Sequence, residues 1–449
     1  MPNQFDVPVR TGSSQKQALV FVHGFSGDAH KTFGMLPAFL AGDRDLQTWD
    51  LYCFGYPTSL APDISGVWAA DPDLTTLTGL LLEYCKNKLV EYRQIALIAH
   101  SMGGLIAQQA ILNPTLEGRV SHLALFGTPS NGLTKAGGLA RFLKRQVRDM
   151  AAGGPFITQL RNSWSAKFPS TIPFVFRAVA GVRDEFVPTE TSVKPFPGYE
   201  AYVNGNHLEI VKPESPSSDT TVLLKLLLGE TPGAPTKILR TPGHEEAERT
   251  VSAPGNQETD LSDKQIVKLA LALEMIGKQE QSIALLQKYA SRSTELTSVL
   301  AGRLKRRWLA DSESRASDGS EALALYRAAF VRASQSGDHP QAYYAGINVA
   351  FLELALDDHA DEAQRIAIRV LDHCRLSNAN KWQLATQGEA YLYLGDLQAA
   401  LAYYSAALEA QPDTREVDSI QKQAVWAARL LKSPEYESRL LKLFEAGPR

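Results

Sequence analysis

Ser101, Asp184 and His207 occur along the chain in the order nucleophile, acid and base, and each follows a short apolar stretch. Ester hydrolysis needs a nucleophile, a base that takes its proton, an acid that orients the base, and amide donors for the oxyanion. Aspartate at position 184 would hold the imidazole of His207 in the tautomer that accepts the proton of Ser101. These residue types predict hydrolysis that calls for no metal and no organic cofactor.

The serine lies at an abrupt boundary between two sequence patterns. The apolar run 95–99 has the length and β-branched content of a buried strand, and helical spacing begins at Leu105 after two glycines. A serine in so tight a strand-to-helix turn exposes its hydroxyl beside backbone amides, and the glycines let helix and strand approach closely. The alternative is that Ser101 is only a helix N-cap, since serine is a favoured capping residue.

The acid and the base each have competitors. Asp184 is preferred to Glu185 because the flanking Gly-x-x-Asp and Val-Pro fit the usual loop after a strand at this place, although a solvated loop acid is the alternative. His207 follows the predicted strand 199–203, and a surface or capping histidine is the alternative. His122 lies inside a predicted strand and His100 directly precedes the nucleophile, so both are poorer bases.

Strands and helices alternate over the first half of the chain. Apolar runs predict strands at 18–22, 49–54, 95–99, 120–126, 173–180 and 199–203, with helices at 31–40, 74–92, after residue 104 and at 217–228. This alternation predicts an α/β domain with a mainly parallel sheet and helices on both faces.

An insertion at about 133–168 interrupts the alternation. Its apolar residues share one helical face and four basic residues share the other: Arg141, Lys144, Arg145 and Arg148. A lid whose basic face contacts anionic lipid headgroups is one interpretation, and it leaves peripheral membrane contact open. A surface helix with a solvated charged face is the other.

Four motifs in order resemble the compact α/β-hydrolases of the lipase and serine-esterase group, including GPI-inositol-deacylase-like esterases: VFVHGFSGD, IAHSMGGLIA, LFGTPSNG and VNGNHLEIVKP, within residues 17 to about 230. The usual G-x-S-x-G pattern has Ala99 in place of its first glycine, and alanine is the smallest intrusion at a position needed for steric clearance. The resemblance implies Ser101 as nucleophile, Asp184 as acid and His207 as base, with oxyanion amides on Phe25 and Met102.

The same resemblance implies carboxylic esters, lipids included, as substrates. Apolar residues in the elements around the predicted site suggest a pocket for an acyl chain: Phe25, Phe33, Met35, Leu36 and Leu139. Fold alone does not set the substrate.

The totals limit the class of protein. A chain of 449 residues is too long for one ordinary core, so two or three domains are expected. A net charge of −3 argues against nucleic-acid binding as the main activity. Three scattered cysteines without metal-ligand spacing favour a reduced, cytoplasmic setting, and the chain has no apolar signal region and no membrane-length apolar run.

The second half has a different organisation. Residues 230–259 are rich in proline, glycine and charge and predict a linker after a domain at 1–229. From 260 to 449 the pattern is helical, and small and aromatic residues in 381–414 match a tetratricopeptide repeat (TPR), with looser copies at 267–290 and 343–374. The wider stretch 320–415 resembles the TPR-containing TRAF-binding region of signalling kinases, which implies a protein-binding array.

The sequence therefore predicts a serine esterase or lipase-type hydrolase joined to a TPR-like domain that binds protein partners or regulates the enzyme. One alternative is a signalling scaffold whose hydrolase fold has lost catalysis. Another is cleavage of amides or thioesters by the same residues, which the motifs do not exclude. A helical appendage that oligomerises the protein, without a peptide groove, is the alternative for the second half.

Overall fold

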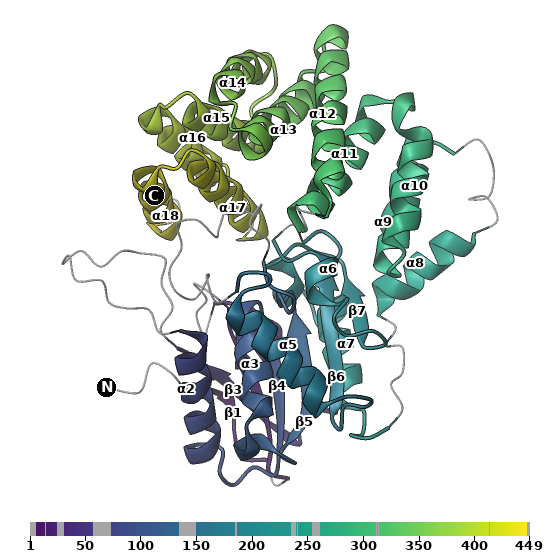
Figure 1. Cartoon of the computed structure of the whole chain (residues 1–449), viewed down its shortest axis with the longest axis vertical. Helices are drawn as coiled ribbons and strands as arrows, with labels where there is room; N and C mark the ends of the chain where they lie inside the picture. The colour runs from purple at the N-terminus through teal and green to yellow at the C-terminus, as the bar shows by residue number, and fades with distance from the viewer. Residues whose placement is uncertain are drawn as a thin grey trace. The chain divides into compact units, whose positions relative to one another are not determined.

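The computed structural model describes residues 6–13, 15–24, 31–56, 73–133, 150–184, 186–234, 239, 241–253, 261–310, 312, 314–412 and 414–446. The chain forms two compact units (Figure 1). The first comprises Met1–Ala253 with Leu271–Gly277, and the second comprises Pro254–Ala270 with Lys278–Arg449.

A seven-stranded sheet in the order β1-β3-β2-β4-β5-β6-β7 forms the centre of the first unit (Figure 1). The strands are β1 (Asp6–Arg10), β2 (Gln17–Val22), β3 (Trp49–Phe54), β4 (Gln94–His100), β5 (Val120–Phe126), β6 (Val175–Gly181) and β7 (Glu200–Val203). All neighbouring pairs are parallel except β1 with β3, which is antiparallel. The predicted α/β class with a mainly parallel sheet is confirmed.

Both faces of the sheet are apolar, which explains the continuous apolar runs. Along β2, Ala18, Val20 and Val22 belong to one core and Leu19 and Phe21 to the other. The first core includes residues of α2 (Leu74–Asn87), α3 (Met102–Leu112) and α5 (Pro155–Lys167), and the second includes residues of α1 (Leu36–Ala41) and α7 (Asp219–Leu228). Helices therefore cover both faces.

Two parts of the first unit differ from the sequence prediction. Strand β1 extends the sheet beyond β3, although the sequence predicts no strand before residue 18. In the insertion 133–168, residues 134–149 lie outside the described part of the chain, and with them the four basic residues. The described remainder contains α5, which buries Ile157, Leu160 and Trp164 in the core, so at least this helix is a packed element of the domain.

The stretch 230–259, predicted as a linker, contains helix α8 (Pro242–Ser252). Thr241 caps it by accepting a hydrogen bond from the His244 amide at 3.2 Å, and Pro242 occupies the first turn, where its missing N–H costs nothing. Ala247 is buried within the first unit, in a cluster with Val182. The proline and glycine content suggested irregular chain, whereas here the proline starts a helix.

The second unit is helical throughout its described residues. After α9 (Asp263–Met275) come α10 (Gln279–Tyr289), α11 (Thr294–Ala310), α12 (Ala316–Ser336), α13 (His339–Asp357), α14 (Ala360–Arg375), α15 (Lys381–Tyr393), α16 (Leu397–Glu409), α17 (Thr414–Leu430) and α18 (Pro434–Ala446). Consecutive helices pack on one another, as α11 does on α12, α13 on α14 and α15 on α16 (Figure 1). The helical C-terminal region is confirmed.

Small residues at the helix contacts explain the repeat pattern. A Cβ atom on Gly388 of α15 would lie 2.9 Å from the ring of Tyr404 on α16, so the glycine makes room for that buried aromatic side chain. The turn between them has Gly395 at φ 79°, and Asp396 accepts from the Ala399 amide at 2.9 Å. Within residues 381–414, α15 and α16 thus form one helix pair, as predicted.

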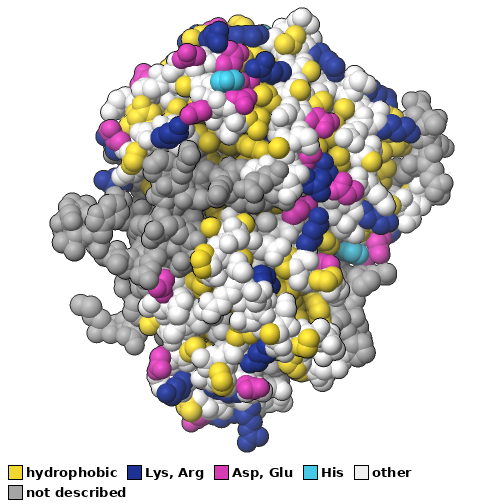
Figure 2. Space-filling view, viewed as in Figure 1, with side chains coloured by type: hydrophobic (Ala, Val, Ile, Leu, Met, Phe, Trp, Pro, Cys, Tyr) yellow, Lys and Arg dark blue, Asp and Glu magenta, His cyan; other side chains and the backbone are white. Residues whose placement is uncertain are grey.

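Among the helices that the structure describes, none is both long enough and apolar enough to cross a bilayer. On the face drawn in Figure 2, the described basic side chains are interspersed with acidic ones instead of gathering in one continuous stripe.

Candidate active site

Ser101 occupies a strained turn between β4 and α3. Its backbone has φ 54° and ψ −128°, a combination that non-glycine residues rarely adopt, and its amide donates to the Phe126 carbonyl of β5 at 2.9 Å. The residue stands at the N-cap of α3, but its side chain makes no capping hydrogen bond to that described helix. The alternative that Ser101 is only a helix N-cap therefore lacks the hydrogen bond for which serine is favoured at that position. The backbone geometry matches that of a nucleophile elbow.

The two glycines after Ser101 are needed for close approach. A Cβ atom on Gly103 would collide with the carbonyl oxygen of His23 at the end of β2, and one on Gly104 would collide with the side chain of Thr128. Ala99, where the usual motif has glycine, points into the core on the α3 side of the sheet and is fully buried. Its methyl group is therefore accommodated.

Asp184 and His207 form a buried hydrogen-bonded pair. Nδ1 of His207 lies 2.7 Å from Oδ2 of Asp184, and the side chains are 7 % and 0 % exposed. Oδ1 of Asp184 also accepts from the amides of Phe186 and Val187 at 2.9 and 2.8 Å. An ionised carboxylate accepts all these bonds, so Nδ1 of His207 is the donor in its bond to Asp184.

Gly127 lies next to the hydrogen bond between these two side chains. Its φ is 51°, and a Cβ atom there would lie 3.0 Å from Nδ1 of His207 and 3.1 Å from Oδ2 of Asp184. It follows Phe126, whose carbonyl accepts the Ser101 amide bond. The end of β5 and the residue after it thus lie next to Asp184, His207 and the Ser101 turn, which places the three predicted residues at the same end of the sheet.

A second link joins the serine turn to His207. Nε2 of His100, the residue before Ser101, lies 2.8 Å from the carbonyl oxygen of His207, and the two imidazole centroids are 4.6 Å apart. Among the described residues no hydrogen bond joins the Ser101 hydroxyl to the His207 ring. Such bonds often form only when substrate binds.

Of the two predicted oxyanion donors, Phe25 lies outside the described residues, and Met102 is the first residue of α3, with its side chain buried in the core. The carbonyl oxygen of Gly24, the last described residue before Phe25, accepts a hydrogen bond from the His23 ring. The Tyr56 amide donates to Nε2 of His23 at 3.2 Å, so Nδ1 carries the proton and donates to the Gly24 oxygen at 2.9 Å. The sequence prediction did not include this use of His23 and Tyr56.

The predicted acyl pocket is wrong at two of its residues. Phe33 and Leu36 are 1 % and 0 % exposed and belong to the core that includes residues of α1 and α7. There Phe33 packs on Phe21 with ring centroids 4.9 Å apart. Phe33 lies just before α1 and Leu36 begins it, and burying such large apolar side chains in the nearest core is favourable. Met35 is 57 % exposed, while Phe25 and Leu139 lie outside the described residues.

The other histidines considered as bases are buried and neutral. Burial lowers the pKa of His100 well below its usual value, with the neighbouring His207 adding to the effect. Burial also lowers the pKa of His122 to about 4, and its Nε2 lies 3.1 Å from the Glu230 carbonyl. His122 pairs with Ala96, near the start of β4, whereas Ala99 lies near the end of that strand, from which the serine turn follows. His122 therefore lies away from the serine turn.

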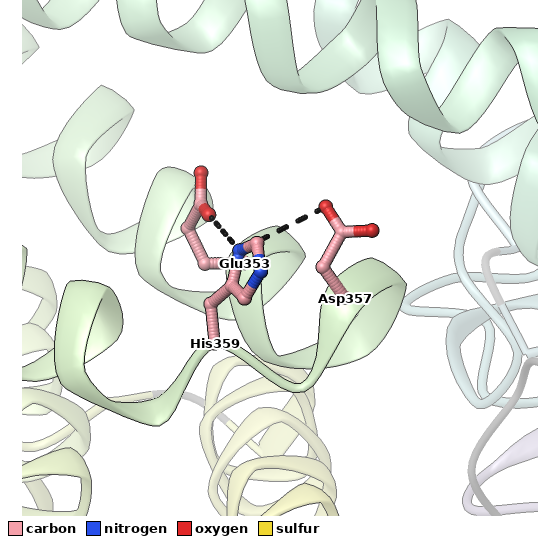
Figure 3. Close-up of side chains that lie close together, drawn as sticks. All are labelled: Glu353, Asp357 and His359. Carbon is pink, nitrogen blue, oxygen red and sulfur yellow. Dashed lines mark hydrogen bonds and ion pairs between the residues drawn. The ribbon is translucent and has the colours of Figure 1, made fainter.

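One cluster in the second unit has metal-ligand residue types: Glu353, Asp357 and His359 (Figure 3). Nδ1 of His359 lies 3.3 Å from Oε2 of Glu353 and 4.0 Å from Asp357 (Figure 3). The other oxygen of Glu353 accepts from Nε of Arg327 at 3.0 Å. The buried carboxylate is thus engaged by a fixed cation, and we interpret the cluster as an ion-pair network at the end of α13.

Comparison with known protein families finds a match in each half of the chain. Residues 19–237 match the model of the alpha/beta hydrolase family, and residues 245–353 match that of the Tetratricopeptide Repeats-Sensor family. The second match ends before the predicted repeat at 381–414. No curated protein matches the chain. The GPI-inositol-deacylase-like and TRAF-binding resemblances are not tested by these matches.

Solved structures with similarity to the chain include two bacterial lipolytic enzymes. Phospholipase PlaB from Legionella pneumophila is 15 % identical over 49 % of this chain and 60 % of its own, with a TM-score of 0.38. Lipase BlEst2 from Bacillus licheniformis in its propeptide form is 17 % identical over 52 % of this chain and 55 % of its own, with a TM-score of 0.39. The chain thus spans little more than half of each, and the similarity does not identify a substrate.

Proposed function

We propose that the α/β-hydrolase domain of residues 19–237 hydrolyses carboxylic esters, with Ser101 as nucleophile, His207 as base and Asp184 as the acid that orients it. The observation that carries this proposal is the buried 2.7 Å bond between Asp184 and His207, at the end of the sheet where Ser101 occupies its strained turn. A buried acid–imidazole pair beside an elbow serine is what acyl transfer requires.

In this mechanism Nε2 of His207 takes the proton of Ser101 as the hydroxyl oxygen attacks the ester carbonyl. The backbone amides of Met102 and Phe25 bind the oxyanion, and Asp184 stabilises the imidazolium. The imidazolium gives its proton to the departing alcohol. Water then attacks the acyl-enzyme with His207 again acting as base, which frees the acid and restores the serine.

The substrates that we propose are acyl esters, lipid esters included. Support comes from the motif resemblance alone, because the residues predicted to line an acyl pocket are either in the core, exposed or outside the described part of the chain. Amide and thioester cleavage use the same groups and remain alternatives. Comparing the Ser101-dependent kcat/KM for p-nitrophenyl esters, anilides and thioesters of the same acyl length ranks the three, since one nucleophilic serine can cleave all of them with different efficiency.

The decisive experiment compares wild type with Ser101→Ala on short-chain p-nitrophenyl esters and with a fluorophosphonate probe. We expect turnover to fall by about 10³-fold or more and labelling to disappear. Equal hydrolysis by the two proteins would contradict the proposal. An unlabelled wild type without turnover would favour the alternative, a scaffold with an inactive hydrolase fold.

For the helical unit we propose protein binding or regulation of the hydrolase, supported by the match to a repeat family named for sensing. Exposed aromatic side chains offer contact points, since Trp382 and Tyr344 are 44 % and 45 % exposed. Loss of captured partners on Trp382→Ala or Tyr344→Ala would support this role. A cytoplasmic location is proposed because all three cysteines are buried and free.

A further inference from the structure

His100 is buried where it can influence both the nucleophile and the base. It ends β4, is 2 % exposed and directly precedes Ser101. Its Nε2 lies 2.8 Å from the backbone carbonyl oxygen of His207, and the two rings are tilted by 42° at 4.6 Å. The bond spans 107 residues of sequence and joins the residue beside the nucleophile to the backbone of the base.

The direction of this hydrogen bond follows from its acceptor. A carbonyl oxygen only accepts, so Nε2 of His100 carries the proton and the neutral ring keeps a lone pair on Nδ1. That Nδ1 atom is buried and has no hydrogen-bond partner among the described residues. An unpaired buried polar atom is unfavourable, so an apolar residue would suit this position better if packing were the whole role.

The base needs a connection toward the serine that its bond to Asp184 does not supply. In the sheet, β4 and β7 are separated by β5 and β6, and His207 follows β7. The loop after β7 is tied to the loop after β6, because the Arg183 amide donates to the Gly205 oxygen at 3.0 Å. These bonds orient the imidazole and hold it near Asp184, but they do not involve β4.

We propose that His100 is a positioning residue whose Nε2–H bond to the His207 carbonyl sets the distance between the base and the Ser101 hydroxyl. This inference rests on the proposed function, in which that distance governs proton transfer. A misplacement of about 1 Å in a catalytic group can lower turnover about 100-fold. The bond holds the backbone of the base from the strand that carries the nucleophile.

Two substitutions at this site separate the hydrogen bond from the volume of the ring. His100→Phe keeps an aromatic ring but cannot donate, and His100→Gln keeps an N–H donor near the position of Nε2. The chain also offers a matched control in His122, a buried neutral imidazole on β5 whose Nε2 likewise contacts a backbone carbonyl, that of Glu230 at 3.1 Å. His122→Phe makes the same change away from the serine turn.

We expect His100→Phe to lower kcat for p-nitrophenyl esters by about 10- to 100-fold with KM nearly unchanged, and to slow fluorophosphonate labelling in parallel. His100→Gln should recover most of the rate. His122→Phe should lower the melting temperature with kcat kept. A His100→Phe protein with wild-type kcat, or a Gln variant no better than Phe, would overturn the proposal.

A crystal structure of His100→Phe provides a readout that needs no activity. The imidazole of His207 should move away from Ser101 while its bond to Asp184 persists. If that ring stays in place, His100 does not position it, whatever the turnover. If the ring moves but wild type hydrolyses no ester and takes no label, the proposed function fails while the positioning role stands.

Discussion

At the scale of single residues, the Asp184–His207 pair, which we propose as acid and base, combines burial with hydrogen bonding. The Asp184 carboxylate accepts from His207 and from two backbone amides, so the charge is buried without being left unpaired. Gly127 provides the space beside the pair. Substitutions here should therefore change catalysis more than they change the surrounding sheet.

Asp184→Asn should lower kcat by about 10⁴-fold, because an amide that donates to Nδ1 would favour the tautomer with the proton on Nε2, which cannot accept the serine proton. Steady-state kinetics on p-nitrophenyl esters measures the loss. Glu190→Gln, a carboxylate of the nearby α6 (Thr189–Ser192), serves as control and should keep activity. Similar rates for Asp184→Asn and wild type would remove Asp184 from the mechanism.

Gly127→Ala should reduce turnover about 10-fold or more, since a methyl group would press on Nδ1 of His207 and Oδ2 of Asp184 and the residue has positive φ. Gly118→Ala is a control for the cost of placing alanine at positive φ. Gly118 has φ 68°, and no described atom lies within 4 Å of the added carbon. Both variants should lose some stability, but only the first should lose kcat. Equal kcat in the two would contradict the role of Gly127.

At the scale of elements, replacing a helical glycine by alanine has opposite effects on stability at different positions, according to the side chains beside it. Gly388 of α15 faces the Tyr404 ring of α16, whereas a methyl carbon added at Gly79 in α2 would meet no described atom within 4 Å. Helix propensity alone favours alanine over glycine by about 1 kcal/mol at both positions. The packing of neighbouring helices therefore decides whether alanine raises or lowers the stability of the protein.

Gly388→Ala should therefore destabilise the protein by about 1–3 kcal/mol, and Gly79→Ala should stabilise it by up to about 1 kcal/mol. Denaturant unfolding followed by circular dichroism measures both changes. If Gly388→Ala were also stabilising, α15 and α16 would pack less closely than the structure has them.

At the scale of the whole molecule, α9 belongs to both compact units, since the boundary falls at Leu271 within the helix. Its residues Ala272 and Met275 form a small apolar cluster with Val182 and Ala247 of the first unit. A chain ending at Gly277 should therefore resist heat better than one ending at Ala253, measured by differential scanning calorimetry. Equal melting temperatures for the two would mean that residues 271–277 add nothing to the first unit.

Buried neutral histidines make stability depend on pH. The pKa of His122 is lowered to about 4 by burial, and that of His100 is lowered chiefly by burial too. The unfolded chain binds their protons near pH 6.5 and the folded chain does not, so stability is present above that pH and falls as the pH drops toward 4. His122→Phe should reduce the loss of unfolding free energy between pH 7.5 and pH 4.5 by about 1–3 kcal/mol, measured by urea unfolding at the two pH values. An unchanged pH dependence would mean that His122 is not neutral in the fold.

The sequence by itself determined the alternation of strands and helices, the turn at Ser101 and the helix pair at 381–414, because each follows from contacts between residues close in the chain. Only the tertiary structure decided the antiparallel pairing of β1, the burial of Phe33 and Leu36 in the core, and the bond from His100 to His207. Those features join segments distant in sequence, and a residue pattern carries no information on which distant partner a side chain meets. The serine turn is a local property of the backbone, whereas the position of its base depends on how four strands lie side by side.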